Sequence, residues 1–511
     1  MLTLADPLEH AQKHHGARVA VIDGEVRIDY ARLVDRCRRL GAGLVAIGLQ
    51  PGDRVALLAA NGHRCLEAFV GIPSHGMVVV PLNTRLAEPE LRAIVVDSGA
   101  RVLVTDRDPG SLSACVERVV SMPDDYERLL ASSAGRLAPA IDESALAALF
   151  YTGGTTGAPK GVMLTHRNLV SNAFHKIVAC SLSGDDRFLA AAPMFHVAGV
   201  APLLGLMWLG AAIVTIPSFD PERCLDLIAE HRITVAMPVP TMLAALVAAQ
   251  RASPRDLSSL RMLGHAGSPI AHALIELAHA TFPTAELAQF YGATETSSIV
   301  TCFRNEQEAI GTPLLGSCGR ATPGVAVKVV RDDGVPCVPD EVGEILVRGP
   351  NVTIGYFRNE EATAAALAGG WYHTGDIGVL RGDGYLFVVD RKKDMIVSGA
   401  ENVYSIEVED VLHRHTSVIE AAVFGIPDPR WGEAVHAVVV IGADDRAGDD
   451  ALAEEIRQHC RAFIAGYKVP KTVEFRTEPL PKSGPGKILK RVLRDPYWRR
   501  VDAVRREIDD P

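Results

Sequence analysis

Short apolar runs that are typical of buried strands alternate with helical patterns along most of the chain, and this alternation restricts the fold more than any other feature. The strand-like runs cover residues 54–59, 77–81, 101–105, 212–216 and 235–238, and helical patterns at 30–47 and 89–97 lie between some of them. Strands that are buried on both faces and separated by helices form largely parallel sheets covered by helices. The pattern therefore predicts an α/β fold.

The pattern changes after about residue 325. Shorter β-rich runs follow at 325–330, 343–347 and 385–389, with turn signals at 332–334 and 382–384. A further unit begins after residue 391, with a helix at 405–415 that opens on Ser405 as N-cap, strands at 418–424, 434–441 and 472–476, and a helix at 452–464. Since 511 residues exceed one compact core, we predict a large N-terminal domain (1–390) with a β-rich subdomain and a small mobile α+β C-terminal domain (395–511).

Charge and cysteine content exclude some classes of protein. The 52 basic and 62 acidic residues give a net charge of -10, which argues against a nucleic-acid binder but is compatible with a locally positive pocket for a small anion. The nine cysteines are scattered and form no C-x-x-C pair, which predicts reduced thiols in a cytoplasmic protein. Asp6 and Pro7 stand where an export signal needs basic and apolar residues, so we expect no such signal.

Residues 197–216 form a stretch of 20 residues without a charge, which is long enough to span a bilayer. The stretch nevertheless contains several glycines and a proline, and its end is typical of a strand. We therefore expect a buried helix, a turn at Gly210 and a buried parallel strand, with no integral membrane segment.

A loop rich in glycine and threonine carries the strongest chemical signal. The apolar residues 147–150 run into YTGGTTGAPKG at 151–161. Glycines let backbone N–H groups approach phosphate oxygens, threonine hydroxyls add donors, and a lysine adds positive charge. A flexible surface loop is the alternative, which this combination after a buried strand disfavours. A Walker loop is excluded because Ala158 and Pro159 separate Gly157 from Lys160.

This segment resembles the phosphate loop Y-T-S-G-T-T-G-x-P-K-G of the adenylate-forming superfamily, which includes acyl-CoA synthetases, luciferases and peptide-synthetase adenylation domains. The chain differs from that pattern in Gly153, which replaces a serine and removes one hydroxyl donor. The resemblance implies that four residues of the segment bind ATP: Thr152, Thr155, Thr156 and Lys160.

Two further segments resemble nucleotide-binding motifs of the same superfamily. YGATE at 291–295 implies that Tyr291 stacks on adenine, Thr294 contacts the α-phosphate and Glu295 holds Mg²⁺. A carboxylate beside a triphosphate needs a cation between them, and Mg²⁺ prefers such oxygen ligands. AGSP at 266–269, with Gly267, resembles the wall between adenine and the acyl group.

Three more motifs follow in the order of the superfamily. YHTGD at 372–376 implies that Asp376 binds the ribose hydroxyls, and DRKKD at 390–394 resembles the hinge (391–394), with Arg391 on the ribose and Lys393 as the pivot. PKSGPGK at 481–487 resembles the loop of the catalytic lysine, here Lys487. Taken singly, a charge run or an exposed lysine is usually a solvated face, but the motifs occur together and in order.

The resemblance implies an acid–thiol ligase. A carboxylate attacks the α-phosphate of MgATP to give acyl-adenylate and pyrophosphate, and a thiol then displaces AMP after the small domain swings about its hinge. Gly399 would line the pantetheine tunnel, where Ala400 replaces the usual second glycine. The CoA-binding residues implied are Trp431, Lys468 and Lys471, for which packing and solvation are the alternatives.

The acid substrate is expected to be fatty or otherwise apolar. His196 lies in a segment, 193–197, that resembles the aromatic–histidine element beside the acyl pocket, although a core histidine would fit the same position. No Asp lies between Arg187 and Phe219 to pair a substrate ammonium, so an α-amino acid is disfavoured. Two alternatives stay open: a ligase that loads a separate carrier protein, and a non-catalytic regulator that binds nucleotide or acyl groups.

Overall fold

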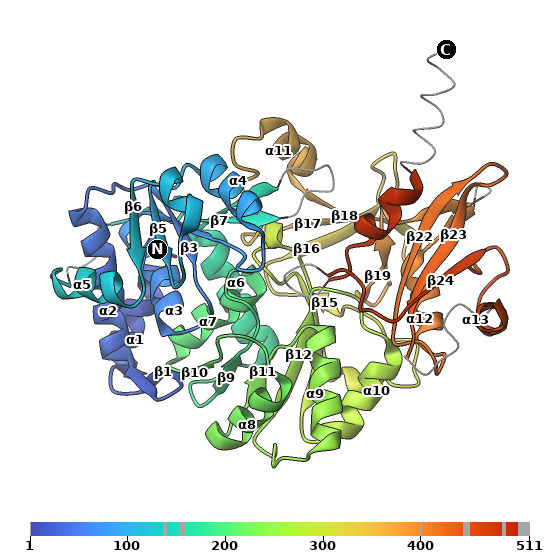
Figure 1. Cartoon of the computed structure of the whole chain (residues 1–511), viewed down its shortest axis with the longest axis horizontal. Helices are drawn as coiled ribbons and strands as arrows, with labels where there is room; N and C mark the ends of the chain where they lie inside the picture. The colour runs from blue at the N-terminus through green and yellow to red at the C-terminus, as the bar shows by residue number, and fades with distance from the viewer. Residues whose placement is uncertain are drawn as a thin grey trace.

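The computed structural model describes residues 2–135, 140–152, 159–398, 401–442, 450–482 and 487–498. Within these ranges the chain forms four sheets of six, nine, four and five strands. The six- and nine-stranded sheets make up the large N-terminal part, and the five-stranded sheet forms the C-terminal unit at the opposite side of Figure 1. The predicted α/β class, with a β-rich subdomain and a smaller C-terminal unit, is confirmed.

The six-stranded sheet has the order β6-β5-β3-β4-β7-β8, and its strands are parallel except for the β7–β8 pair. Alternate residues of β3 explain how both faces are covered: Val55 and Leu57 pack into the core with α2 and α3, whereas Ala56 and Leu58 pack against α4. The elements of this region are α2 (Tyr30–Ala46), β3 (Arg54–Leu58), α3 (His63–Gly71), β4 (Val78–Pro81), α4 (Glu88–Ser98), β5 (Val102–Thr105), β6 (Arg118–Ser121), α5 (Asp124–Ala131), β7 (Leu146–Thr152) and β8 (Lys160–Thr165).

The nine-stranded sheet lies beside the first and has the order β15-β14-β13-β12-β11-β9-β10-β1-β2. Helices α6 and α7 cover the face toward the first sheet, and α8, α9 and α10 cover the other face. Its elements are α1 (Ala5–His15), β1 (Val19–Asp23), β2 (Val26–Asp29), α6 (His166–Cys180), β9 (Arg187–Ala190), α7 (Val197–Leu209), β10 (Ala212–Thr215), α8 (Pro221–His231), β11 (Val235–Ala236), α9 (Pro240–Ala252), β12 (Met262–Ala266), α10 (His272–Thr281), β13 (Glu286–Tyr291), β14 (Thr301–Arg304) and β15 (Arg320–Ala321).

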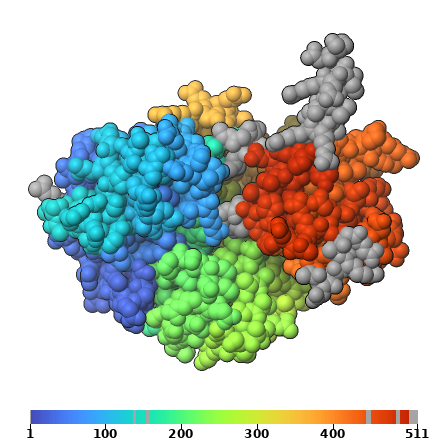
Figure 2. Space-filling model, in the orientation of Figure 1, coloured from blue at the N-terminus to red at the C-terminus, as the bar shows by residue number. Residues whose placement is uncertain are grey.

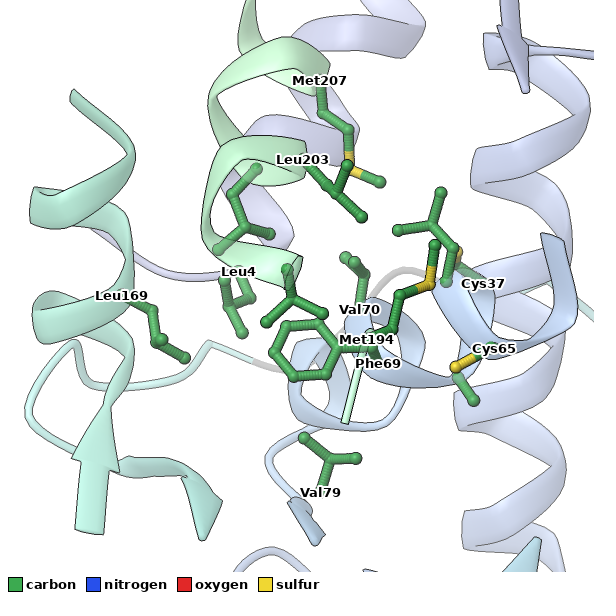
Figure 3. Packing of buried hydrophobic residues seen from close by; sticks show 14 of the residues in the cluster. Leu4, Cys37, Cys65, Phe69, Val70, Val79, Leu169, Met194, Leu203 and Met207 are labelled. Atoms are coloured by element: carbon green, nitrogen blue, oxygen red, sulfur yellow. The ribbon is translucent and has the colours of Figure 1, made fainter. Parts of the chain in front are cut away.

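One buried cluster joins the two large sheets. Phe69 of α3 and Val79 of β4 face Leu203 and Met207 of α7, with Met194 between them (Figure 3). All of these side chains are almost fully buried. The segment that leads into α7 is therefore anchored in the main core.

The uncharged stretch at 197–216 folds as expected. It forms α7, then turns at Gly210, whose positive φ of 69° suits a glycine. It continues as β10, which pairs in parallel with β1 and β9. None of the helices in the described ranges has both the length and the apolar character that crossing a membrane requires.

The β-rich subdomain is a four-stranded antiparallel sheet in the order β16-β17-β18-β19. It consists of β16 (Ala326–Val330), β17 (Val342–Arg348), α11 (Glu360–Ala366), β18 (Tyr372–Leu380) and β19 (Leu386–Arg391). The C-terminal unit follows with β20 (Ile396–Ser398), β21 (Glu401–Val403), α12 (Ser405–Leu412), β22 (Glu420–Asp428), β23 (Gly432–Val440), α13 (Asp450–Phe463) and β24 (Thr472–Arg476).

Two local predictions are wrong. Ser405 is the first residue of α12 and not its N-cap, because its hydroxyl donates to Asp390 Oδ1 at 3.0 Å instead of capping the helix, which ends at Leu412. The strand expected at 235–238 is only two residues long, and the chain enters α9 at Pro240, a residue that suits a first helical turn.

Candidate active site

Two sheets meet where β13 ends. The Tyr291 hydroxyl at the end of β13 donates a 2.8 Å hydrogen bond to Asp376 Oδ2 on β18. Asp376 lies directly opposite Arg391 on β19, and the Arg391 Nε is 3.4 Å from Asp376 Oδ1. Three residues that sequence motifs place far apart along the chain therefore form one connected group.

The next residues of the same motif turn sharply. Gly292 has no room for a side chain, because a Cβ there would lie 1.8 Å from the carbonyl oxygen of Ser298. A short 3-10 helix, Thr294–Thr296, follows, in which Thr294 is buried. This turn places Glu295 near β8, and the Thr353 N–H donates to the Glu295 carbonyl at 2.7 Å.

Tyr356 joins Glu295 to the glycine-rich segment. Its hydroxyl donates to Glu295 Oε1 at 3.0 Å, and the Lys160 ammonium lies 5.1 Å from the centroid of its ring. Burial raises the pKa of the Glu295 carboxyl. No sequence motif singles out Tyr356, so this contact was missed; only the fold brings it to Glu295.

Thr152 and Lys160 flank the glycine-rich loop and pair directly, since Thr152 ends β7 and Lys160 begins β8. Thr155, Thr156 and Gly399 lie outside the described residues. The anchoring strands of the loop therefore hold Lys160 on the same side of the molecule as Glu295.

Lys487 comes from the C-terminal unit and is half-buried. Burial, and next the positive charge of Arg391, lower the pKa of its ammonium group to about 7, while Asp376 and Asp394 oppose the shift. Burial also lowers the pKa of Lys393. The structure thus brings Lys487 into the electrostatic environment of the Tyr291, Asp376 and Arg391 group.

Polar contacts attach the C-terminal unit to the rest of the molecule, and Figure 2 shows the two parts packed against each other. Lys392 Nζ lies 2.9 Å from Asp332 Oδ1 and 3.5 Å from Glu344 Oε2. The Lys490 ammonium donates to the Ser405 hydroxyl at 2.6 Å, which in turn contacts Asp390. These contacts surround the residues expected to form the hinge.

His196 is the N-cap residue of α7, where its Nδ1 accepts from the Ala198 N–H at 3.2 Å. Burial lowers the pKa of its imidazole to about 4, so the ring is neutral at physiological pH. Gly267, directly after β12, has a φ of 92°, which favours glycine.

Asn61 fixes the segment before His196, a role that sequence reasoning missed. Its amide donates to the carbonyls of Ala190 and Ala192 at 3.1 and 2.9 Å and accepts from the Met194 N–H at 2.8 Å. Together with the buried Met194 side chain (Figure 3), these bonds hold the segment rigidly. The partners are about 130 positions apart, with separations of 129 to 133, so no local pattern predicts them.

The residues expected to bind CoA lie at one end of the C-terminal sheet, where β23 and β24 begin. Trp431 is 40% exposed, and the Arg430 guanidinium lies 4.6 Å from its ring centroid. Lys471 is exposed, but the Lys468 ammonium lies 2.8 Å from both carboxylate oxygens of Glu407. The charge of Lys468 is therefore already compensated within the protein.

The chemistry of Glu295 fits a magnesium ion shared with a nucleotide. The described ranges contain no cluster of three or more His, Cys, Asp or Glu side chains arranged to hold a metal. Glu295 is a partly buried carboxyl whose full ionisation needs a nearby cation. Mg²⁺ commonly takes one or two carboxylates and completes its shell with phosphate oxygens and water.

Comparisons with known proteins agree with this geometry. The model of the family described as AMP-binding enzyme matches residues 8–357, and the model described as AMP-binding enzyme C-terminal domain matches residues 407–487. A feruloyl-CoA synthase of Amycolatopsis sp is 41% identical, with 93% of this chain and 95% of the relative covered. The fatty acid–[acyl-carrier-protein] ligase ScoC of Streptomyces coeruleorubidus is 35% identical, with 96% and 95% covered.

A solved structure is similar to this chain over nearly its whole length. The o-succinylbenzoate CoA synthetase of Bacillus subtilis, in complex with its acyl-adenylate intermediate, superposes with a TM-score of 0.86 at 32% identity. The match covers 95% of this chain and 97% of that one. The likeness therefore extends over both the large part and the C-terminal unit.

Proposed function

Because this chain belongs to the AMP-binding enzyme family and is an acyl-CoA ligase, with ATP and CoA as substrates of its class, we propose that it works in two steps. A carboxylate first attacks the α-phosphate of ATP and releases pyrophosphate, and the CoA thiol then displaces AMP from the acyl-adenylate. One observation carries the proposal: Tyr291, Asp376 and Arg391 form one connected group, and the half-buried Lys487 of the C-terminal unit lies in its electrostatic environment.

The first step joins an anion to a polyanion. Two unit charges about 4 Å apart repel by roughly 4 kcal/mol at an effective dielectric constant near 20. Without compensation this repulsion slows the reaction about a thousandfold. We assign the compensation to the ammonium groups of Lys487 and Lys160. Mg²⁺ held by Glu295 would neutralise part of the phosphate charge.

The other residues of the group orient the nucleotide. Asp376 accepts hydrogen bonds from the ribose hydroxyls, with Arg391 beside it, and Tyr291 stacks on adenine. The Thr294 hydroxyl donates to the α-phosphate. The donors assigned to the remaining phosphates are the hydroxyls of Thr152, Thr155 and Thr156.

The second step requires Lys487 to leave the site. We propose that residues 391–394 are a hinge between a large domain (1–390) and a small one (395–511), with Lys393 as the pivot. Rotation would bring Gly399 to the pantetheine path. The exposed Trp431 ring and the Lys471 ammonium suit the adenine and phosphates of CoA. Lys468 then acts through its ion pair with Glu407, as a structural support of that surface.

For the acid we propose an aryl or aliphatic carboxylic acid. Gly267 and the neutral His196 border the acyl group, and the segment fixed by Asn61 forms part of its wall. The feruloyl-CoA synthase relative acts on an aryl acid by its name, which supports the aryl alternative.

We also place the protein in the cytoplasm. All nine cysteines are free thiols in the structure. Reduced thiols are the usual state of cysteine in that compartment, and ATP and CoA are available there.

A separate carrier protein is the second candidate for the thiol. The carrier-protein ligase among the relatives favours it, as does the ion pair that occupies Lys468. Free CoA and a phosphopantetheinylated carrier protein distinguish the two acceptors directly.

The test is a panel of carboxylic acids assayed for pyrophosphate release with and without CoA, with the wild-type chain and Lys487→Ala. We expect pyrophosphate release with at least one acid, thioester formation when CoA is added, and loss of both with Lys487→Ala. ATP binding without pyrophosphate release across the panel would instead identify a non-catalytic nucleotide-binding protein.

A further inference from the structure

Lys176, on α6, is a buried charged residue that the proposed reaction does not use. It is only 3% exposed, and its ammonium lies 4.0 Å from the centroid of the Phe290 ring. Within the described parts of the chain, no salt bridge or hydrogen bond engages this ammonium group beyond the ring contact. Buried lysines are rare, and in folded proteins they are normally paired.

The groups around Lys176 supply no negative charge. Its titratable neighbours are the thiols of Cys180, one helical turn further on, and Cys302 on β14. Burial raises the pKa of Cys180 to about 11 and that of Cys302 to about 12, so both thiols stay protonated at neutral pH. Burial also lowers the pKa of Lys176 itself. An acceptor oxygen at this position would satisfy the buried donor.

The position of α6 connects Lys176 to the candidate active site. One turn before Lys176, the Asn172 amide donates to the carbonyl of Ile299 at 3.0 Å and to that of Thr296 at 3.4 Å. Thr296 closes the short helix that carries Glu295. The same face of α6 therefore runs from the nucleotide-binding turn to Lys176.

Phe290 connects Lys176 to the segments that border the acyl group. Phe290 immediately precedes Tyr291, and its ring lies against Gly264, where a Cβ would be 2.4 Å from the Phe290 Cε2. The same Cβ would be 3.4 Å from Met237 Cγ. Gly264 lies on β12, which ends directly before Gly267, so the Phe290 ring contacts both the buried ammonium and the strand that leads into Gly267.

We propose that Lys176 is a specificity-determining residue that binds an acceptor oxygen at the end of the acid remote from the reacting carboxyl group. The inference rests on the proposed function and narrows its substrate class to acids with a second polar group. A phenolic hydroxyl and a second carboxylate both provide such an acceptor oxygen. A buried charged donor discriminates strongly against an analogue without the acceptor, because the donor is then left unsatisfied.

The experiment compares matched acids with wild-type protein, Lys176→Met and the control Lys13→Met, which changes an exposed lysine on α1. The pairs are cinnamate with 4-hydroxycinnamate, and octanoate with octanedioate. We expect wild type to prefer the second member of one pair by about 10- to 100-fold in kcat/KM for pyrophosphate release. In Lys176→Met this ratio should fall to near one, while kcat/KM for the acid without the second polar group should not decrease. Lys13→Met should keep the wild-type ratio.

Thermal unfolding provides an independent readout, because Met fills the same volume without an uncompensated charge. We expect Lys176→Met to melt at a higher temperature than wild type. The inference is overturned if wild type prefers neither acid of a pair, or if Lys176→Met keeps the wild-type ratio of kcat/KM. It is also overturned if Lys176→Met lowers kcat/KM equally for both acids, or if this variant melts at a lower temperature than wild type. Absence of pyrophosphate release from every acid with wild type refutes the proposed function itself.

Discussion

The rate of acid activation should depend on pH through Lys487. Burial and the charge of Arg391 lower the pKa of this ammonium to about 7. The profile of kcat/KM reports the ionisation of groups in the free enzyme. If the protonated form is the active one, about half of the free enzyme is competent at pH 7 and about a tenth at pH 8. We therefore expect kcat/KM for ATP, measured by pyrophosphate exchange, to fall about tenfold per pH unit above 7.

The matched variants separate Lys487 from other titrating groups. Lys487→Ala should be about a thousandfold slower, as estimated from the uncompensated charge repulsion, and its rate should not decline through pH 7. Lys13→Ala, on the far part of the molecule, should keep the wild-type profile. A wild-type decline centred above pH 9, or a variant that still declines at pH 7, would refute the assignment.

The same pKa also predicts how stability changes with pH. The folded pKa of Lys487 lies below that of an unfolded lysine, so between about pH 7 and 10.4 the unfolded chain binds more protons. The unfolding free energy of wild type, relative to Lys487→Ala, should therefore rise with pH across this window. Urea titrations at pH 7 and 9.5 measure the difference, and a relative stability that falls would contradict it.

Three further predictions concern other parts of the chain. Gly292→Ala forces a Cβ to within 1.8 Å of a backbone carbonyl, so pyrophosphate exchange should fall about 100-fold, whereas a rate within twofold of wild type would contradict the geometry. Glu295→Gln should raise the magnesium concentration needed for half-maximal exchange at least tenfold, and an unchanged requirement would exclude Glu295 as a ligand. Glu67→Ala removes a carboxylate that lies 2.6 Å from the nearly buried Arg36 guanidinium and leaves this group with Glu127 as its remaining ion-pair partner in the described chain. Urea unfolding should therefore show a loss of about 3 kcal/mol, and a loss below about 1 kcal/mol would contradict this.

Much of the fold could be predicted because apolar runs report burial. The run at 472–476 matches β24. The uncharged stretch around Gly210 folds as a helix, turn and parallel strand because its glycines and proline disfavour one long helix. Ser405 shows the limit of such reasoning: the residue type is right for an N-cap, but its hydroxyl donates to Asp390 of β19.

Contacts between distant parts of the chain could not be predicted from local patterns. Tyr356 meets Glu295 only because the β-rich subdomain folds over the turn after β13. Asn61 orders the segment before His196 from another sheet, through three hydrogen bonds that no spacing encodes. Lys468 has the residue type expected of a phosphate ligand, but α12 places Glu407 against it.

Acid activation that depends on a lysine from the small domain is the central claim, and the two half-reactions of Lys487→Ala test it most directly. Pyrophosphate exchange with a good acid substrate should fall about a thousandfold. Thioester formation from chemically prepared acyl-adenylate and CoA should stay within a few-fold of wild type, since the second step takes place with this lysine withdrawn. Equal loss of both half-reactions, or unimpaired exchange, would contradict the account.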